Sequence, residues 1–144
     1  MGVIMNRLKP IAVAVAVVFT TFLALSPILT VRAQQVGEIK RNFLMTKDIS
    51  VTGYEGRLAQ VVFAPGSREP KHTHPGDVLA YVQEGTLTQH LEGAPTVTVK
   101  PGDVFFVPAG KIHWAECADT PCKVLATFIV EKGKPLTSLA SPGK

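Results

Sequence analysis

Turn-forming glycine and proline residues recur along most of the chain and divide it into segments too short for helices. Downstream of Gly53 they recur at intervals of roughly eight to twelve residues, which is typical of all-β domains. The segments between them alternate apolar and polar residues or are short apolar runs, and none keeps a helical period for three turns. With 144 residues the chain is long enough for one domain. We therefore predict a single all-β sandwich or barrel.

The predicted strands follow from these segments. In chain order they are Phe43 to Val51, Arg57 to Ala64, Val78 to Gln83, Thr86 to Leu91, Thr96 to Lys100, Val104 to Val107, Lys111 to Cys117 and Cys122 to Val130. The mostly apolar run from Val78 is typical of a strand covered on both faces. We expect residues 34–41 to be a loosely held arm, and the tail from Glu131, rich in Lys, Gly, Pro and Ser, to fray.

The N-terminus has the pattern of an export signal peptide. Arg7 and Lys9 precede an apolar run from Ile11 to Leu25, and Pro27 ends that run. Small residues then stand before a cleavage point that follows Ala33. The pattern predicts an exported protein, periplasmic in a Gram-negative bacterium and otherwise secreted.

Cleavage at this point would remove residues 1–33 and leave residues 34–144 as the single mature domain. The alternative is an uncleaved anchor, because the stretch from Ile11 to Val31 is about long enough to span a bilayer. Membrane contact is expected only through this segment, and only if it stays attached.

The net charge excludes one class of partner. The formal charge of the whole chain is +4, from 15 basic and 11 acidic residues. Arg7, Lys9 and Arg32 lie in the predicted leader and all acidic residues lie outside it, so the mature domain carries 12 − 11 = +1. A charge this small gives no electrostatic footprint for nucleic acid or a membrane surface.

The two cysteines, Cys117 and Cys122, are predicted to form a disulfide. Two cysteines in an exported protein usually pair, and these flank a turn-forming tetrad that ends at Pro121. The turn would place them opposite each other across a hairpin. Two free thiols remain the alternative, and a pair of cysteines with this spacing is weak grounds for a metal site.

Three of the four histidines form a candidate metal site. His72 and His74 are one residue apart and would point to the same side of an extended segment. His113 follows a Pro-Ala-Gly turn, whereas His90 lies in a polar alternating segment where we expect it to be solvated. Because imidazole nitrogen binds divalent transition metals well, the three are predicted to hold one such ion inside the barrel.

These histidines stand in two motifs that resemble the paired signature of the cupin superfamily. The first motif has Gly66, five residues, His72-x-His74 and then Gly85. The second motif has Gly102, five residues and then Pro108-x-Gly110-x-x-His113. The resemblance implies a small jelly-roll barrel, a metal bound in its mouth by these three histidines, and a homodimer.

Two positions depart from the cupin pattern. The first motif normally supplies a glutamate ligand four residues after its second histidine, where this chain has Val78. Asp77 is acidic, but neighbours on a strand face opposite ways, so only a bulge at Pro75-Gly76 would turn it inward. The second motif normally ends in asparagine, where this chain has Cys117.

The departures bear on which metal and ligand the site would take. Imidazole ligands suit iron, zinc, copper or nickel, and the missing carboxylate argues against manganese. Val61, Phe63, Val78 and one of the adjacent phenylalanines, Phe105, are predicted to line an apolar pocket for a small organic ligand.

Two functions remain open at the level of the sequence. The first is a metal-dependent enzyme that acts on a small organic substrate, with dioxygenase-like chemistry suggested by cupin-like enzymes that use iron on three histidines. The second is a non-catalytic module that binds a metal or a small molecule, which the loss of the glutamate favours. No catalytic acid or base is identified.

Overall fold

The computed structural model describes Gly2 and residues 37–141, so the predicted signal peptide lies outside the described residues. The described residues form ten strands and no helix, and so none long and apolar enough to cross a membrane. The strands are β1 (Ile39–Asp48), β2 (Tyr54–Phe63), β3 (His72–Thr73), β4 (Gly76–Glu84), β5 (Leu87–Leu91), β6 (Val97–Val99), β7 (Val104–Val107), β8 (His113–Cys117), β9 (Cys122–Glu131) and β10 (Ser138–Leu139).

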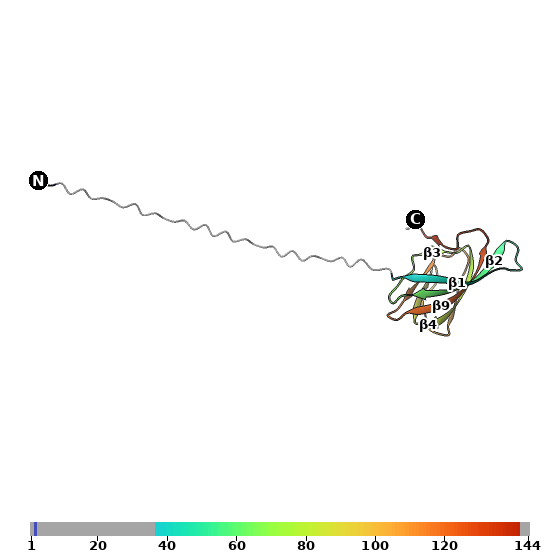
Figure 1. Cartoon of the computed structure of the whole chain (residues 1–144), viewed down its shortest axis with the longest axis horizontal. Helices are drawn as coiled ribbons and strands as arrows, with labels where there is room; N and C mark the ends of the chain where they lie inside the picture. The colour runs from blue at the N-terminus through green and yellow to red at the C-terminus, as the bar shows by residue number, and fades with distance from the viewer. Residues whose placement is uncertain (1, 3–36, 142–144) are drawn as a thin grey trace. The chain divides into compact units, whose positions relative to one another are not determined.

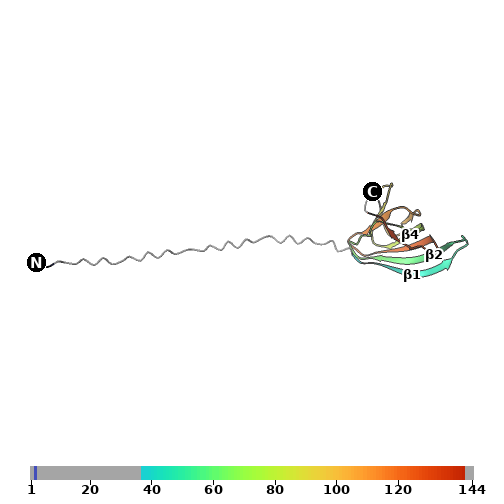
Figure 2. The ribbon, with the colours of Figure 1, turned by 90° about the horizontal axis from the view of Figure 1, so that it is seen from above.

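The strands form two five-stranded antiparallel sheets that pack face to face as a jelly-roll barrel. The first sheet has the order β1-β2-β9-β4-β7, and its four longest strands lie side by side in Figure 1. The second sheet has the order β10-β3-β8-β5-β6. Seen from above, β1 and β2 curve along the same side of the domain (Figure 2). The all-β prediction is confirmed.

One apolar core lies between the two sheets. In β9 every second residue faces it, as the alternation from Val124 to Val130 predicted. The inward faces of β2 and β4 contribute in the same way, and Leu87, Val99 and Ala115 close the core from the second sheet. Burial of alternate side chains is therefore what fixes the register of the long strands.

Three predictions about the ends and faces of strands are wrong. β1 begins at Ile39, within the segment expected to be an arm, because residues 39–48 pair with β2 through the backbone although most of their side chains are exposed. The outer face of β4 is not covered in the described chain, since Leu79 and Tyr81 are about half exposed. The tail does not fray throughout, because Ser138 and Leu139 form β10 against β3.

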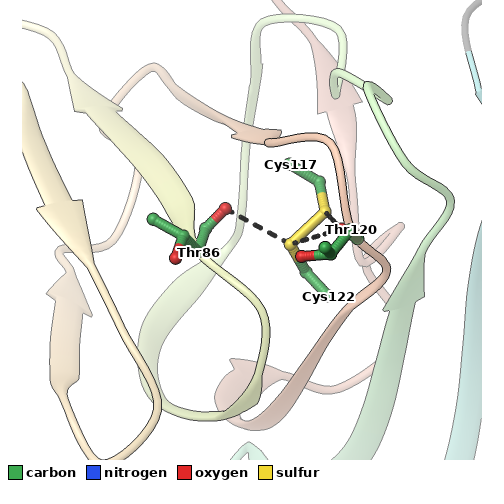
Figure 3. The surroundings of a disulfide bond; sticks show 4 residues. All are labelled: Thr86, Cys117, Thr120 and Cys122. Atoms are coloured by element: carbon green, nitrogen blue, oxygen red, sulfur yellow. Dashed lines mark hydrogen bonds between the residues drawn. A yellow bond between two sulfur atoms is a disulfide. The ribbon is translucent and has the colours of Figure 1, made fainter.

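Cys117 and Cys122 form the predicted disulfide, but the strands they belong to are not a hairpin (Figure 3). β8 pairs with β3 and β5 in the second sheet, while β9 pairs with β2 and β4 in the first. The bond, with Cα atoms 6.0 Å apart, therefore ties one sheet to the other. Its Cys122 sulfur lies 3.3 Å from the carbonyl oxygen of Thr86.

Gly85 is required at the turn that packs against this disulfide. Its φ angle is +77°, a conformation that side chains disfavour. An added Cβ would lie 2.7 Å from the Cys122 sulfur and 2.5 Å from the carbonyl oxygen of Pro121. The closing glycine of the first histidine motif is thus set by close packing at the sheet junction.

Reduction of the disulfide is expected to lower the free energy of unfolding by about 2 kcal/mol, because the short loop restricts the unfolded chain only modestly. Urea unfolding with and without dithiothreitol measures this change. The matched control is the double variant Cys117→Ser/Cys122→Ser, on which dithiothreitol should have no effect. An unchanged unfolding midpoint of the reduced wild-type protein would contradict the prediction.

Candidate metal centre

Backbone pairing brings the three histidines of the two motifs together. His72 in β3 lies directly opposite His113 in β8, and His74 follows β3 by one residue. Because side chains alternate along an extended chain, His72 and His74 point to the same side. All three are buried, with no more than 4% of each residue exposed.

The three imidazole rings converge on one point. One ring nitrogen from each residue lies within 4.8 Å of the corresponding nitrogens of the other two. The ring centroids are 4.2 to 4.9 Å apart, and the Nε2 atoms of His72 and His74 are 3.2 Å apart. Two nitrogens bound to one ion at about 2.1 Å and a right to tetrahedral angle would be roughly 3.0–3.4 Å apart. The separation between His72 and His74 lies in this range, and the third ring has its nitrogen within 4.8 Å of both.

Each ring is held by a hydrogen bond from its other nitrogen to a backbone carbonyl. Nδ1 of His72 donates to Pro70 at 2.8 Å. Nδ1 of His74 donates to Leu136 at 2.6 Å, and Nδ1 of His113 donates to Lys111 at 3.1 Å. A carbonyl oxygen can only accept, so the proton of each neutral ring must be on Nδ1. All three Nε2 atoms therefore present lone pairs.

This arrangement fits a metal ion. Two lone pairs that face each other at 3.2 Å repel unless a cation lies between or beside them. Metal-binding histidines usually donate their second ring proton to a carbonyl or carboxylate, which is the pattern of all three rings here. The donor set of three imidazoles suits zinc, iron, copper or nickel.

Burial disfavours the charged form of two of the three rings, His74 and His113. Loss of solvent lowers the pKa of His74 from 6.5 to about 4, although its hydrogen bond to Leu136 acts in the opposite direction. Loss of solvent also lowers the pKa of His113 to about 4, and the neighbouring His72 adds to the effect. At neutral pH these two rings are neutral and able to bind a metal.

The histidines open into a small apolar cavity of about 40 Å³. All four predicted lining residues, Val61, Phe63, Val78 and Phe105, lie on its wall. The volume is room for on the order of three water molecules. A ligand that enters without movement of the wall would have only a few non-hydrogen atoms.

The fourth ligand position is apolar, and Asp77 does not replace it. Val78 is 4% exposed and lines the cavity, which places its methyl groups where cupins normally have a carboxylate. β4 pairs with β9 without interruption from Gly76 to Val82, so the bulge considered at Pro75-Gly76 is absent. The Asp77 carboxylate instead accepts a hydrogen bond of 2.9 Å from the backbone N–H of Ala109.

Two other residues lie outside the site. Cys117, at the position of the motif asparagine, is in the disulfide. His90 is half-buried rather than solvated, and its ring stacks on Trp114 with centroids 4.5 Å apart. Its Nδ1 lies 3.0 Å from the hydroxyl of Thr96. His90 therefore has a structural environment of its own, away from the three histidines.

Two charged residues in the cavity wall, Arg41 and Glu69, were not among the predicted site residues. Glu69 lies in the loop before β3, and its Oε2 accepts a hydrogen bond of 3.2 Å from the backbone N–H of Ala115. Burial raises the pKa of Glu69, while His72 and Arg41 act in the opposite direction. The only sequence signal for Glu69 was its place three residues before His72.

Known proteins with a similar sequence match this chain over part of their length. Germin-like protein 5-1 of Oryza sativa subsp. japonica is 34% identical over 77 residues, 49% of this chain and 35% of that protein. The (R)-mandelonitrile lyase of Granulicella tundricola is 37% identical over 62 residues, 43% of this chain and 47% of that protein. The chain thus spans about a third to a half of the length of these relatives.

Solved structures agree with the fold. A cupin-like protein from Thermotoga maritima has a TM-score of 0.59 and 26% identity, over 72% of this chain and 77% of that one. The DMSP lyase DddQ of Ruegeria pomeroyi has a TM-score of 0.59 over 70% of this chain and 51% of that one, and at 21% identity it supports the fold alone.

The family model described as "Cupin domain" matches residues 59–131, about half of the chain and most of the barrel, including all three histidines. Together with the jelly-roll topology, this match shows that the chain belongs to the cupin family.

Proposed function

We propose that this protein binds one divalent transition metal (iron, zinc, copper or nickel) through Nε2 of His72, His74 and His113, and that it acts on a small organic substrate. The observation that carries the proposal is the convergence of three buried lone pairs, each fixed by an Nδ1 hydrogen bond to the backbone.

The residues of the chain have distinct parts in the proposed chemistry. A divalent ion on three neutral imidazoles keeps its full double charge, so it would polarise an oxygen atom of a ligand and acidify bound water. The wall that includes Val61, Phe63 and Phe105 excludes bulk water and so strengthens electrostatic interactions within the cavity. Glu69, whose pKa burial raises, is the carboxyl group of the wall that can hold or release a proton.

Metal analysis of the purified, untagged protein tests the ligand set. We expect about one equivalent of transition metal in the wild type and a large loss in His74→Ala, because one of three ligands is gone. His90→Ala is the matched control, since it removes a histidine that stacks on Trp114 outside the site. A wild-type protein that binds no transition metal under any loading condition would refute the proposal.

Restoring the carboxylate at Val78 should tighten metal binding. Val78→Glu places a charged oxygen in the cavity beside the imidazoles, and we expect the metal dissociation constant to fall about tenfold or more. Leu79→Glu is the control, because Leu79 faces outward from the same strand and is 49% exposed. Equal metal affinities of the two variants would contradict the assigned orientation of Val78.

Acid should destabilise the metal-free protein between pH 6.5 and pH 4. The folded pKa values of His74 and His113 are about 4, whereas the unfolded values are near 6.5. As the pH falls through this window the unfolded chain takes up protons that the folded chain does not, so the free energy of unfolding decreases. The decrease should be on the order of a few kcal/mol in total.

Urea unfolding of the metal-free protein at several pH values measures this dependence. His74→Leu removes one of the two titrating groups and should show a shallower decrease over the same window. An equally steep decrease in that variant would mean that other groups cause the acid sensitivity.

Whether the site is catalytic separates the two functional classes. The (R)-mandelonitrile lyase among the relatives and the three-histidine donor set support an enzyme, with lyase or dioxygenase-like chemistry. The apolar Val78 in place of a carboxylate supports the alternative, a non-catalytic binding module. Turnover and oxygen uptake by metal-loaded protein are measured with mandelonitrile, small thiols, phenols and diketones. Turnover that stops when the metal is removed would exclude the pure binding module.

Two further proposals concern the state of the protein in the cell. We propose that residues 1–33 are removed on export, a view that the disulfide supports because such bonds persist in oxidising compartments. N-terminal sequencing of the protein from its own compartment should give Gln34 first.

We also propose a homodimer, which the exposed apolar side chains of Leu79, Val104 and Phe106 would favour. Sedimentation equilibrium measures its mass.

A further inference from the structure

The cavity beside the three histidines has two charged side chains in its wall, Arg41 from β1 and Glu69 from the loop before β3. The other lining residues are apolar, apart from Gln89 and the histidines themselves. The two charged groups therefore decide which charge the cavity favours in a ligand.

Arg41 has hydrogen-bonding capacity to spare. Its Nη2 lies 3.7 Å from Oε1 of Glu69, which is an ion pair but too long for a good hydrogen bond. Its Nε–H is buried and has no hydrogen-bond partner among the described residues. Burying a donor without an acceptor is unfavourable, so a ligand oxygen that reached this N–H would be bound favourably.

The guanidinium group and the histidine cluster share a neighbour, Phe128. The central carbon of the guanidinium is 6.0 Å from the ring centroid of Phe128, and that ring packs edge-on against His74 with centroids 5.1 Å apart. Both residues are in the cavity wall. Because Arg41 and the three histidines line the same cavity, a small molecule bound there would share it with both groups.

The charges in the cavity do not cancel when a divalent metal is bound. Three neutral imidazoles leave the ion at +2, Arg41 adds +1, and Glu69 when ionised contributes −1, so the sum is +2. In cupins with the motif glutamate, that ligand would remove one further charge, but here the position is Val78. This net positive charge favours an anionic ligand, and solvent screens only part of it because the Arg41 side chain is 27% exposed.

The size of the cavity limits that anion. Its volume is about 40 Å³, and the metal would occupy part of the space. A carboxylate with about one or two carbon atoms is at the upper limit of this room, and its two oxygen atoms give one for each side of the cavity. The planar guanidinium is also well suited to carboxylate geometry.

We propose that this cavity selects a small, acetate-sized carboxylate, whose one oxygen accepts a hydrogen bond from Nε–H of Arg41 while the other faces the three-histidine centre. The proposal rests on the proposed metal binding and narrows the substrate to small carboxylates. Arg41 would be the residue that sets specificity for an anion over a neutral ligand of the same shape.

The test uses the mature protein, residues 34–144, loaded with Co²⁺. The visible absorption bands of Co²⁺ change when a ligand enters its coordination site. Acetate and its neutral isostere acetamide are titrated separately. We expect acetate to bind at least about tenfold more tightly, since a charge-assisted hydrogen bond is stronger than a neutral one. Equal affinities for acetate and acetamide would overturn the proposal without any variant.

Variants of β1 then test the role of Arg41. Arg41→Met keeps most of the side-chain volume and should weaken acetate binding about tenfold or more, and acetamide binding less, because the neutral carbonyl oxygen accepts a weaker hydrogen bond than a carboxylate oxygen. Lys40→Met removes the charge of the exposed neighbour and should leave both affinities unchanged. Acetate binding by Arg41→Met that equals the wild type would overturn the role of Arg41.

The outcome for cobalt separates this proposal from the one on which it rests. If the wild type takes up no Co²⁺, or any other transition metal, both proposals fall. If cobalt binds with the absorption of a nitrogen-rich site but acetate has no preference over acetamide, metal binding stands and the carboxylate proposal alone is wrong.

Discussion

The site depends on three hydrogen bonds that run from imidazole Nδ1 atoms to backbone carbonyls. Two of the carbonyls, of Pro70 and Lys111, lie two residues before the histidine that each one holds. The third, of Leu136, comes from the far end of the chain. Together these bonds fix the tautomer of every ring and aim its free lone pair inward. Because the backbone sets the tautomers, the donor set depends on the second sheet, which holds His72 and His113, and on the C-terminal segment in place.

The net charge of the cavity depends on one residue, Val78, which stands where cupins normally have a carboxylate ligand. With valine at position 78 no carboxylate joins the imidazoles, and the only acidic side chain in the wall, Glu69, is engaged with Ala115 and Arg41. The positive charge of a bound ion would be left largely uncompensated within a cavity whose other lining residues are mostly apolar. Such a site would bind metal less tightly than one with a carboxylate, and it would interact more strongly with negatively charged ligands.

Much of the fold and of the ligand set could be predicted because the responsible signals are local. Turn residues and two-residue alternation predicted the strands, and the spacing of His72 and His74 predicted their common side. The beginning of β1 and the whole of β10 escaped prediction, because backbone pairing stabilises them while most of their side chains stay exposed, which leaves no apolar pattern. Arg41 and Glu69 come from separate parts of the chain, so no local sequence pattern predicts their ion pair.

The disulfide likewise was only partly predictable from local sequence. The pairing of Cys117 with Cys122 was predictable from their spacing and the predicted export, whereas its position between two sheets was not. A short loop between strands normally indicates a hairpin. Here the chain crosses from one sheet to the other within that loop, and only the complete pairing of β8 and β9 shows it.

The contact between His74 and Leu136 has a practical consequence for anyone who prepares the protein. The backbone N–H of Ala140 also donates a hydrogen bond to the carbonyl of Lys71, so two hydrogen bonds hold the C-terminal segment against the segment that carries His72 and His74. An affinity tag fused at the C-terminus would begin a few residues from the carbonyl that orients one ring. A polyhistidine tag at that end would in addition compete for the ion, so samples for metal work are best purified by ion exchange and size exclusion.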